Sequence, residues 1–233
     1  MCPDERKLIY CDLESIDYKE AWDLQKKVHQ LRVENKIDDT LFLLEHPHTY
    51  TLGKTADRKN LIGTEKYLND NKISVYDIDR GGDITYHGPG QIVGYPIINL
   101  TEWQQDTHKY LRGLEEVIIK VCLDYGLQAK RIKDLTGVWI ENNRKIAAIG
   151  IKVSRWITMH GFAFNINTDL RIFSGIIPCG ISDKTVTSLS KELGKEFIPL
   201  NEVKEKILHY FLEYFSFKKI ELKSKEEIFH LVS

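Results

Sequence analysis

One glycine-rich stretch organises the rest of the chain: Arg80-Gly81-Gly82-Asp83-Ile84-Thr85-Tyr86-His87-Gly88-Pro89-Gly90-Gln91. It holds four glycines, one proline and a single aliphatic residue, so it is not expected to form core. Glycine is favoured where the backbone needs a positive φ or must approach another group closely. The apolar runs 73–78 and 92–100 on either side are predicted to be buried strands. This pattern favours a functional loop on a rigid frame over the alternative, a pair of tight turns in a β-rich fold.

Composition indicates an ordinary globular protein. Of the 233 residues, 42% are hydrophobic and 29% charged, and the formal net charge of −1 favours neither nucleic acid nor an anionic membrane as a partner. No apolar run approaches the roughly 20 residues that cross a bilayer, and no apolar signal region follows the N-terminal residues. We therefore expect one domain over residues 1–233, acting as a monomer in the cytoplasm.

The spacing of the cysteines supports a cytoplasmic location. They are far apart and form no CxxC pair, which argues against a disulfide framework or a zinc ribbon and fits a reducing environment. His46 and His48 are separated by one residue, but two histidines in one short segment do not make up a metal-ligand set, so no metal is expected. The four cysteines are Cys2, Cys11, Cys122 and Cys179.

Periodicity predicts the main elements. Long helices are expected from Asp17 to about Lys36 and from about Asp106 to Gly126, each with an apolar face at helical spacing. Pro96 within the run 92–100 predicts an edge strand or a bulge. Shorter helices are expected at 65–69, from about 201 and at 225–231, and strands at 8–12, 40–45, 137–141, 145–153 and 157–166.

Small residues recur on two of the predicted strands. They are Ala147, Ala148 and Gly150 on one strand and Gly161 and Ala163 on the next. Small side chains on facing strands leave space that can line a pocket, although tight packing of a helix would explain the same pattern.

Three kinds of residue are candidates for chemistry. Cys179, between Pro178 and Gly180, can supply a thiolate nucleophile beside backbone N–H groups; otherwise it is a small hydrophobic residue in a turn. Lys145 begins an apolar strand, where burial favours the neutral amine that can act as a base; otherwise it is simply solvated. His87 and His160 are competing partners for the thiol, and the sequence does not rank the three.

Five blocks in order resemble the lipoyl(octanoyl) transferases, the LipB family. The stretch 80–91 with Tyr95-Pro96 is similar to the family signature. The others are Glu45-His-Pro-His-Thr-Tyr-Thr-Leu-Gly53, Gly137-Val-Trp139 with Lys145-Ile-Ala-Ala-Ile-Gly150, His160-Gly-Phe-Ala-Phe-Asn165 and Pro178-Cys-Gly180. Together they cover residues 40 to 185.

The resemblance implies an α/β fold like the catalytic domain of biotin and lipoate protein ligases, a mixed sheet flanked by helices. It implies transfer of octanoyl from acyl carrier protein to a lysine of apo lipoyl domains, in 2-oxoacid dehydrogenase complexes and the glycine cleavage H protein, without ATP or another cofactor. Cys179 would carry the acyl thioester and Lys145 would be its acid/base partner. The substrate site would comprise Arg80, Gly81, Gly82, Asp83, Ile84, Thr85, Tyr86, His87, Ala148, Ile149, Gly150, Gly161, Phe162 and Ala163.

Three other functions compete with this one. An ATP-dependent lipoate or biotin ligase of the same fold would need an adenylate site and no catalytic thiol. A thioesterase could use the same thiol with water as the acceptor, and would release free octanoate. An inactive module would bind lipoyl domains and form no acyl-enzyme with any donor.

Overall fold

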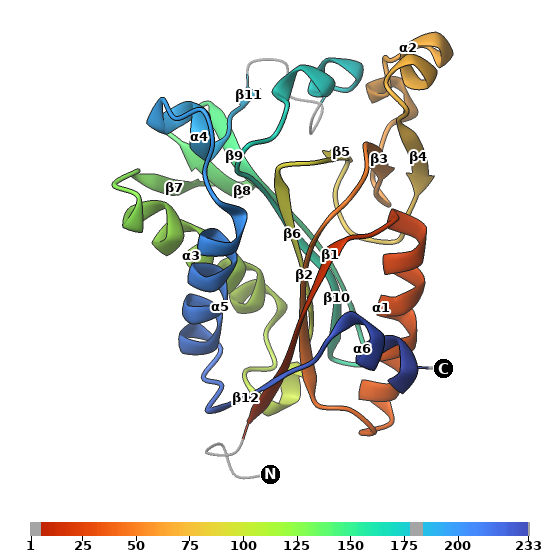
Figure 1. Ribbon diagram of the computed structural model, residues 1–233, viewed down its shortest axis with the longest axis vertical. Helices are drawn as coiled ribbons and strands as arrows, with labels where there is room; N and C mark the ends of the chain where they lie inside the picture. The colour runs from red at the N-terminus through yellow and green to blue at the C-terminus, as the bar shows by residue number, and fades with distance from the viewer. Residues whose placement is uncertain (1–5, 178–183, 233) are drawn as a thin grey trace.

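The computed structural model describes residues 6–177 and 184–232. A long mixed sheet divides the molecule, with helices packed on both of its faces (Figure 1). The strand order of the described sheet is β12-β1-β2-β6-β10-β9-β8-β7, and β11 pairs with β9. Its strands are β1 (Lys7–Ser15), β2 (Asp39–Glu45), β6 (Gln91–Ile97), β7 (Ala129–Ile132), β8 (Leu135–Ile140), β9 (Arg144–Ser154), β10 (Ile157–Asn165), β11 (Thr185–Val186) and β12 (Lys219–Leu222).

Helices cover the two faces of the sheet. On one face lie α3 (Thr107–Asp124) and α5 (Leu200–Tyr214), and on the other lie α1 (Tyr18–Val33) and α6 (Lys225–Leu231) (Figure 1). Capping fixes where the long helices α1 and α3 begin. The carboxylates of Asp17 and Asp106 accept hydrogen bonds from backbone N–H groups in the first turns of α1 and α3. The sheet separates two apolar clusters, because alternate side chains of its central strands point to opposite faces.

A smaller sheet lies at one end of the molecule. Its order is β4-β3-β5, and it is covered by the short helix α2 (Glu65–Asp70). The strands are β3 (Thr49–Leu52), β4 (Ser74–Asp77) and β5 (Ile84–His87). The glycine-rich stretch is therefore not loop throughout, since β5 forms its middle. The expectation of a buried strand at 73–78 was also wrong in part, because β4 is an edge strand and none of its residues is buried.

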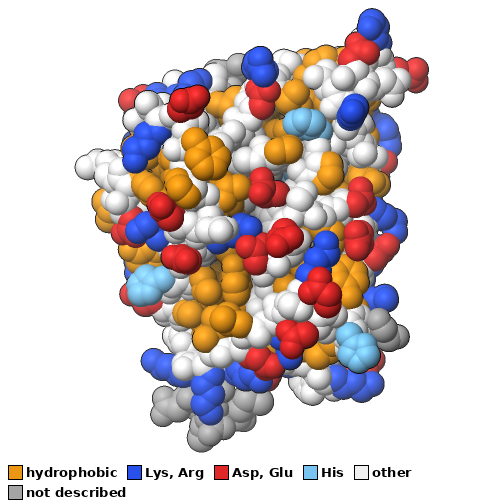
Figure 2. Space-filling view, in the orientation of Figure 1, with side chains coloured by type: hydrophobic (Ala, Val, Ile, Leu, Met, Phe, Trp, Pro, Cys, Tyr) orange, Lys and Arg blue, Asp and Glu red, His pale blue; other side chains and the backbone are white. Residues whose placement is uncertain are grey.

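The described chain is completed by short elements between these strands and helices. They are α4 (Leu189–Leu193) and the 3-10 turns η2 (Arg58–Asn60), η3 (Leu100–Glu102) and η4 (Leu170–Gly175). Acidic and basic side chains are interspersed over the face shown in Figure 2, as expected for a net charge of −1.

Pro96 lies in a central strand, so the expectation of an edge strand was wrong. β6 pairs with β2 through Leu41↔Pro96, and with β10 only up to Phe162↔Gly94. The missing N–H of Pro96 is tolerated because the β6–β10 ladder is interrupted there. The Thr158 hydroxyl fills the gap: it donates to the Pro96 carbonyl at 2.8 Å and accepts the Ile98 N–H at 3.0 Å.

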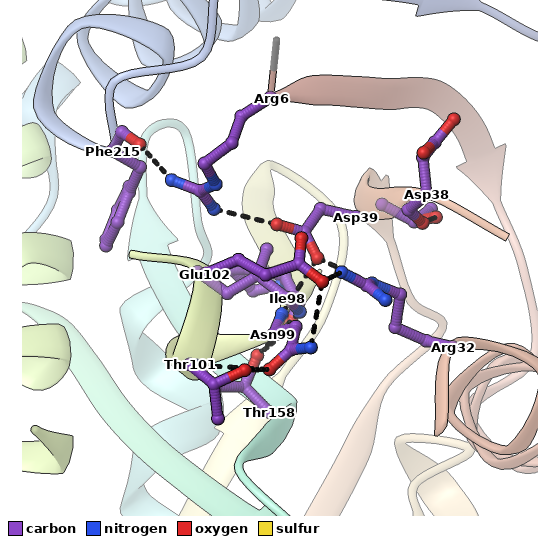
Figure 3. A network of polar contacts seen from close by, with 12 residues as sticks. Arg6, Arg32, Asp38, Asp39, Ile98, Asn99, Thr101, Glu102, Thr158 and Phe215 are labelled. Atoms are coloured by element: carbon purple, nitrogen blue, oxygen red, sulfur yellow. Dashed lines mark hydrogen bonds and ion pairs between the residues drawn. The ribbon is translucent and has the colours of Figure 1, made fainter. Parts of the chain in front are cut away.

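A buried ionic network joins the far end of the sheet to α1 (Figure 3). Asp39 is 3% exposed. Its carboxylate accepts from Arg6 Nη2 at 2.7 Å and from Arg32 Nε at 2.8 Å, and also from the backbone N–H of Asn99 at 2.8 Å. Arg32 pairs in turn with Glu102 at 2.6 Å. The network links the residue before β1 to α1, β2 and the segment after β6.

Candidate active site

A cavity of about 270 Å³ lies between the main sheet, the start of α1 and the glycine-rich stretch. It brings together nearly all the predicted substrate-site residues that the structure describes. Its described lining is Tyr18, Arg80, Gly82, Asp83, Ile84, Thr85, His87, Tyr95, Asp134, Leu135, Thr136, Lys145, Ala148, Ile149, Gly150, His160, Gly161, Phe162 and Ala163. Gly81 and Tyr86 are the predicted residues that do not line it.

The small residues of β9 and β10 form the floor. Ala148 lies directly opposite Ala163, and Gly150 directly opposite Gly161, in the antiparallel pair. Both pairs line the cavity, so these four small residues mark a pocket, whereas Ala147 packs into the apolar cluster on the face that α3 and α5 cover. A side chain at Gly150 would displace the roof, because its Cβ would lie 2.8 Å from Arg80 Cδ.

Arg80 forms part of the roof and is held by the small sheet. Its Nη2 donates to the Thr51 carbonyl at 2.8 Å and to the Thr51 hydroxyl at 3.0 Å. The next residue ties the roof to the main sheet, since the Gly81 N–H donates to the Ile151 carbonyl at 2.9 Å. Gly81 therefore positions the roof from outside the cavity. Tyr86 points away from the cavity, and its hydroxyl meets His48 Nδ1 at 2.7 Å.

The two histidines considered as partners for the thiol have other contacts. His87 is buried, with Nδ1 3.0 Å from Gln91 Oε1 and Nε2 3.3 Å from the Thr51 hydroxyl. Burial keeps the pKa of His87 well below its ordinary value, so its ring is neutral near pH 7. It acts as a neutral hydrogen-bonding wall of the cavity.

His160 is paired with Asp79, the residue before Arg80. Its Nε2 lies 2.8 Å from Asp79 Oδ1, and Asp79 also binds Lys152 Nζ. Burial lowers the pKa of His160, while the hydrogen bond from His160 is the main cause of a lowered Asp79 pKa. A neutral His160 thus donates Nε2–H to an ionised carboxylate. The backbone at His160 has a φ of 57°, and its N–H leaves the ladder to reach Gln25 Oε1 at 2.8 Å.

Aromatic residues close the end of the cavity near Gly161. His46 Nδ1 donates to the Ile16 carbonyl at 2.8 Å, so its Nε2 accepts from the Tyr95 hydroxyl at 2.8 Å. Burial lowers the pKa of His46 to about 4. Tyr18 stacks on His87 with ring centroids 5.6 Å apart. Sequence reasoning missed Tyr18 and Tyr95 as lining residues: Tyr18 falls at the start of the helix predicted from Asp17, and Tyr95 was noted only inside a motif.

Lys145 lies at the other end of the cavity and is 8% exposed. Its Nζ is 4.6 Å from the centroid of the Trp139 ring. A second cavity of about 20 Å³ shares Thr85, Lys145, Ala148 and Ala163 with the first, which extends the space beyond the amine. β11 runs alongside, with Val186 opposite Lys145.

Cys179 lies outside the described residues. The chain leading to it is tied to the roof: the Ile177 N–H donates to the Asn60 carbonyl at 2.8 Å, and Asn60 Nδ2 donates to Asp83 Oδ2 at 2.6 Å. The chain after it rejoins the sheet where the Thr187 N–H donates to the Lys145 carbonyl at 2.9 Å. The described chain before Cys179 is thus linked to Asp83 of the cavity lining through Asn60, and the chain after it contacts Lys145 directly.

The two described cysteines lie in the core and away from the cavity. Cys11 and Cys122 are buried, and burial raises the pKa of each thiol to about 12, so neither supplies a thiolate near pH 7. Among residues 6–177 and 184–232, no three His, Cys, Asp or Glu side chains are grouped to hold a metal ion. No helix in these ranges is long and apolar enough to cross a membrane.

Comparison with known proteins decides the family. Residues 17–212 match the family described as Lipoyl protein ligase A/B catalytic domain. The chain is 50% identical to an octanoyltransferase of Christiangramia forsetii over 214 residues, covering 85% of this chain and 92% of the relative. It is 45% identical to an octanoyltransferase of Caldicellulosiruptor bescii over 224 residues, covering 95% and 97%.

The chain belongs to the octanoyltransferase family. This confirms the resemblance seen in the five sequence blocks. Solved structures show that the fold is shared with the ligases. A bipartite lipoate protein ligase from Thermoplasma acidophilum superposes with a TM-score of 0.71 at 17% identity, covering 98% of this chain and 90% of its own. Biotin protein ligase from Aquifex aeolicus gives 0.52 at 15%, covering 90% and 70%. The expected ligase-like mixed sheet flanked by helices is thereby confirmed.

Proposed function

We propose that this octanoyltransferase moves an octanoyl group from acyl carrier protein to a lysine of an apo lipoyl domain through a thioester on Cys179. The donor thioester is already activated, so the reaction needs no ATP. Carrier protein and the lipoyl domains of 2-oxoacid dehydrogenase complexes and of the glycine cleavage H protein are the proposed partners. A free thiol nucleophile suits the reducing cytoplasm.

In the first half-reaction, the Cys179 sulfur attacks the carbonyl carbon of the donor. Lys145 takes the thiol proton, a new C–S bond forms, and the bond to the carrier sulfur breaks. Lys145 then gives the proton to the departing carrier thiolate. Because one thioester is exchanged for another, this step is nearly balanced and the octanoyl-enzyme can accumulate.

In the second half-reaction, the neutral amine of the acceptor lysine attacks the same carbonyl carbon. A C–N bond forms, the C–S bond to Cys179 breaks, and Lys145 carries the proton from the amine to the cysteine sulfur. The product amide is more stable than the thioester, which drives the reaction forward. The sum is octanoyl thioester plus amine giving octanoyl amide plus carrier thiol.

The dimensions of the cavity support an acyl chain of this length. The floor from Ala163 to His160 covers three residue steps of β10, which is about 10 Å at the rise of a strand. An extended octanoyl chain has seven C–C bonds of ~1.5 Å and is roughly 9 Å long. With its carbonyl near Lys145, its tail would lie toward Tyr18 and Tyr95. His87 and Arg80 would form the roof above it.

The observation that carries the proposal is the position of Lys145. This buried lysine lines the end of an apolar cavity beside the strand that follows Cys179. A lysine there can exchange protons with both reacting sulfurs. The two halves of the chain around Cys179 contact Asp83 through Asn60 on one side and Lys145 on the other.

Product analysis tests the function. Purified protein, octanoyl-carrier protein and an apo lipoyl domain are mixed without ATP, and the domain is examined by peptide mass mapping. The proposal predicts an octanoyl amide on one lysine of the domain. Free octanoate as the sole product would identify a thioesterase, and acylation that requires ATP and free acid would identify a ligase.

A further inference from the structure

A buried carboxylate on α3 has no place in the mechanism above. Glu115 is 0% exposed. Its Oε2 accepts from Arg112 Nη1 at 2.7 Å and from Arg131 Nε at 3.0 Å, and its Oε1 accepts the backbone N–H of Gly137 at 3.0 Å. The carboxylate therefore links α3 to the beginning of β8.

The two arginines do not need Glu115 in order to be solvated. Their side chains are 41% and 34% exposed, and Arg131 also binds Glu116 Oε2 at 2.6 Å. Unlike the two arginines, the Gly137 N–H depends on Glu115 for a hydrogen bond, because Gly137 is buried and its N–H has lost contact with water. Glu115 thus supplies the hydrogen-bond acceptor for the buried Gly137 N–H, and the two arginines stabilise the negative charge of the buried carboxylate.

Gly137 in turn forms a wall against the stem of Lys145. Its φ is 119°, and a Cβ there would lie 2.6 Å from the Ala147 carbonyl oxygen and 3.4 Å from Lys145 Cε. The β8–β9 register shifts at this point, between Val138 and Trp139, and Trp139 lies opposite Lys145. The conformation of Gly137 thus sets both the space beside the Lys145 stem and the start of the strand that carries the Trp139 ring.

We propose that Glu115 is a positioning residue for Lys145: by holding the Gly137 N–H, it fixes the wall against which the lysine side chain packs. The inference rests on the proposed function, in which Lys145 carries the proton. A small displacement of a proton-transfer group has a large kinetic effect, since a shift of about 1 Å can cost on the order of 100-fold in rate. A purely structural role, limited to pairing the buried Gly137 N–H, would lower stability when lost and leave the rate constant of the folded enzyme unchanged.

Rapid mixing with octanoyl-carrier protein separates positioning from folding. The amplitude of octanoyl-enzyme formation measures the competent fraction of the protein, and the rate constant measures the chemistry of that fraction. In Glu115→Leu we expect the rate constant to fall on the order of 10- to 100-fold, with the apparent KM for the donor unchanged. Glu115→Gln keeps an oxygen acceptor for Gly137 and should restore the rate constant to within a few-fold of the wild type.

The matched control is Glu116→Leu, which removes a neighbouring contact of Arg131 and leaves Gly137 untouched; its rate constant should equal the wild-type value. A reduced amplitude with a wild-type rate constant in Glu115→Leu would overturn the proposal. If that variant does not fold, Glu115→Asp keeps the charge for the arginines and withdraws the acceptor by one methylene. A wild-type rate constant in Glu115→Asp would likewise overturn it. If the wild-type protein forms no octanoyl-enzyme, the proposed function itself fails, and the positioning role fails with it.

Discussion

Ala148 and Ala163 lie directly opposite one another in the β9–β10 pair, and both line the cavity. The pair leaves an open floor between Lys145 and the aromatic end at Tyr95. This arrangement makes the path of the acyl group testable, because any larger side chain at these positions takes space from the acyl chain rather than from the core.

Ala148→Leu should therefore slow transfer from short and long donors alike, because position 148 lies at the carbonyl end of the floor. The added carbons enter the cavity, so we expect kcat/KM for an octanoyl donor to fall about 10- to 100-fold, equivalent to roughly 1–3 kcal/mol. A butyryl donor occupies the same position and should lose a similar factor. The measurement is steady-state transfer with the two donors side by side. Ala129→Leu, outside the cavity lining, is the control, and a wild-type kcat/KM in Ala148→Leu would contradict the account.

Replacing Lys145 tests the proton carrier. Lys145→Ala should lower the rate constants of both half-reactions by about 10²- to 10⁴-fold, the usual contribution of general acid–base catalysis. Single-turnover acylation and deacylation are measured separately, with Lys191→Ala, an exposed lysine on α4, as the control. A variant that only raises KM would show that Lys145 binds substrate and does not carry protons.

The buried network at the far end of the sheet should matter for stability and not for chemistry. Asp39→Ala leaves Arg6 and Arg32, each about 5% exposed, without their shared carboxylate, so the free energy of unfolding should fall by about 3–5 kcal/mol. Urea denaturation measures this. Asp38→Ala removes only a half-exposed ion pair with Lys7 and should cost less than about 1 kcal/mol. An equal loss in the free energy of unfolding for Asp39→Ala and Asp38→Ala would refute the stabilising role of the buried network.

Stability should depend on pH through His46. Its pKa is about 4 in the folded protein against an ordinary value of 6.5, so the unfolded chain binds this proton more tightly. The free energy of unfolding therefore rises with pH across this window, and acidification from pH 7 to pH 5 should remove about 2 kcal/mol through His46 alone. The lowered pKa of buried His87 acts in the same direction.

The readout for His46 is urea denaturation at the two pH values. His46→Gln should show a smaller loss between pH 7 and pH 5 than the wild type, whereas His230→Gln, at an exposed position, should leave the loss unchanged. An unaltered loss in His46→Gln would show that other groups set the acid sensitivity.

Sequence patterns predicted those features of the fold and the site that depend on residues close together in the chain. Asp17 and Asp106 predicted the starts of α1 and α3, because capping depends on residues within one helical turn. The small residues of two adjacent strands indicated either a pocket or a tightly packed helix, and the antiparallel pairing places four of them opposite each other on the cavity floor.

Residues that meet through long-range packing could not be predicted in this way. Tyr95 lines the cavity because β6 lies next to β10, and Asp79 reaches His160 across 81 positions of the chain. Of the two alternatives predicted from Pro96, the edge strand was wrong, because the β6–β10 ladder is interrupted there and Thr158, 62 positions away, bonds the Pro96 carbonyl. Each of these contacts depends on the assembled sheet and not on a local pattern.

The most direct test of the central claim is the intact mass of the protein after mixing with octanoyl-carrier protein in the absence of ATP, followed by peptide mapping. The account predicts a gain of one octanoyl group on Cys179 that disappears when apo lipoyl domain is added, and no such gain in Cys179→Ser. Transfer to the domain at the wild-type rate by Cys179→Ser, or acylation only with ATP and free octanoate, would contradict it.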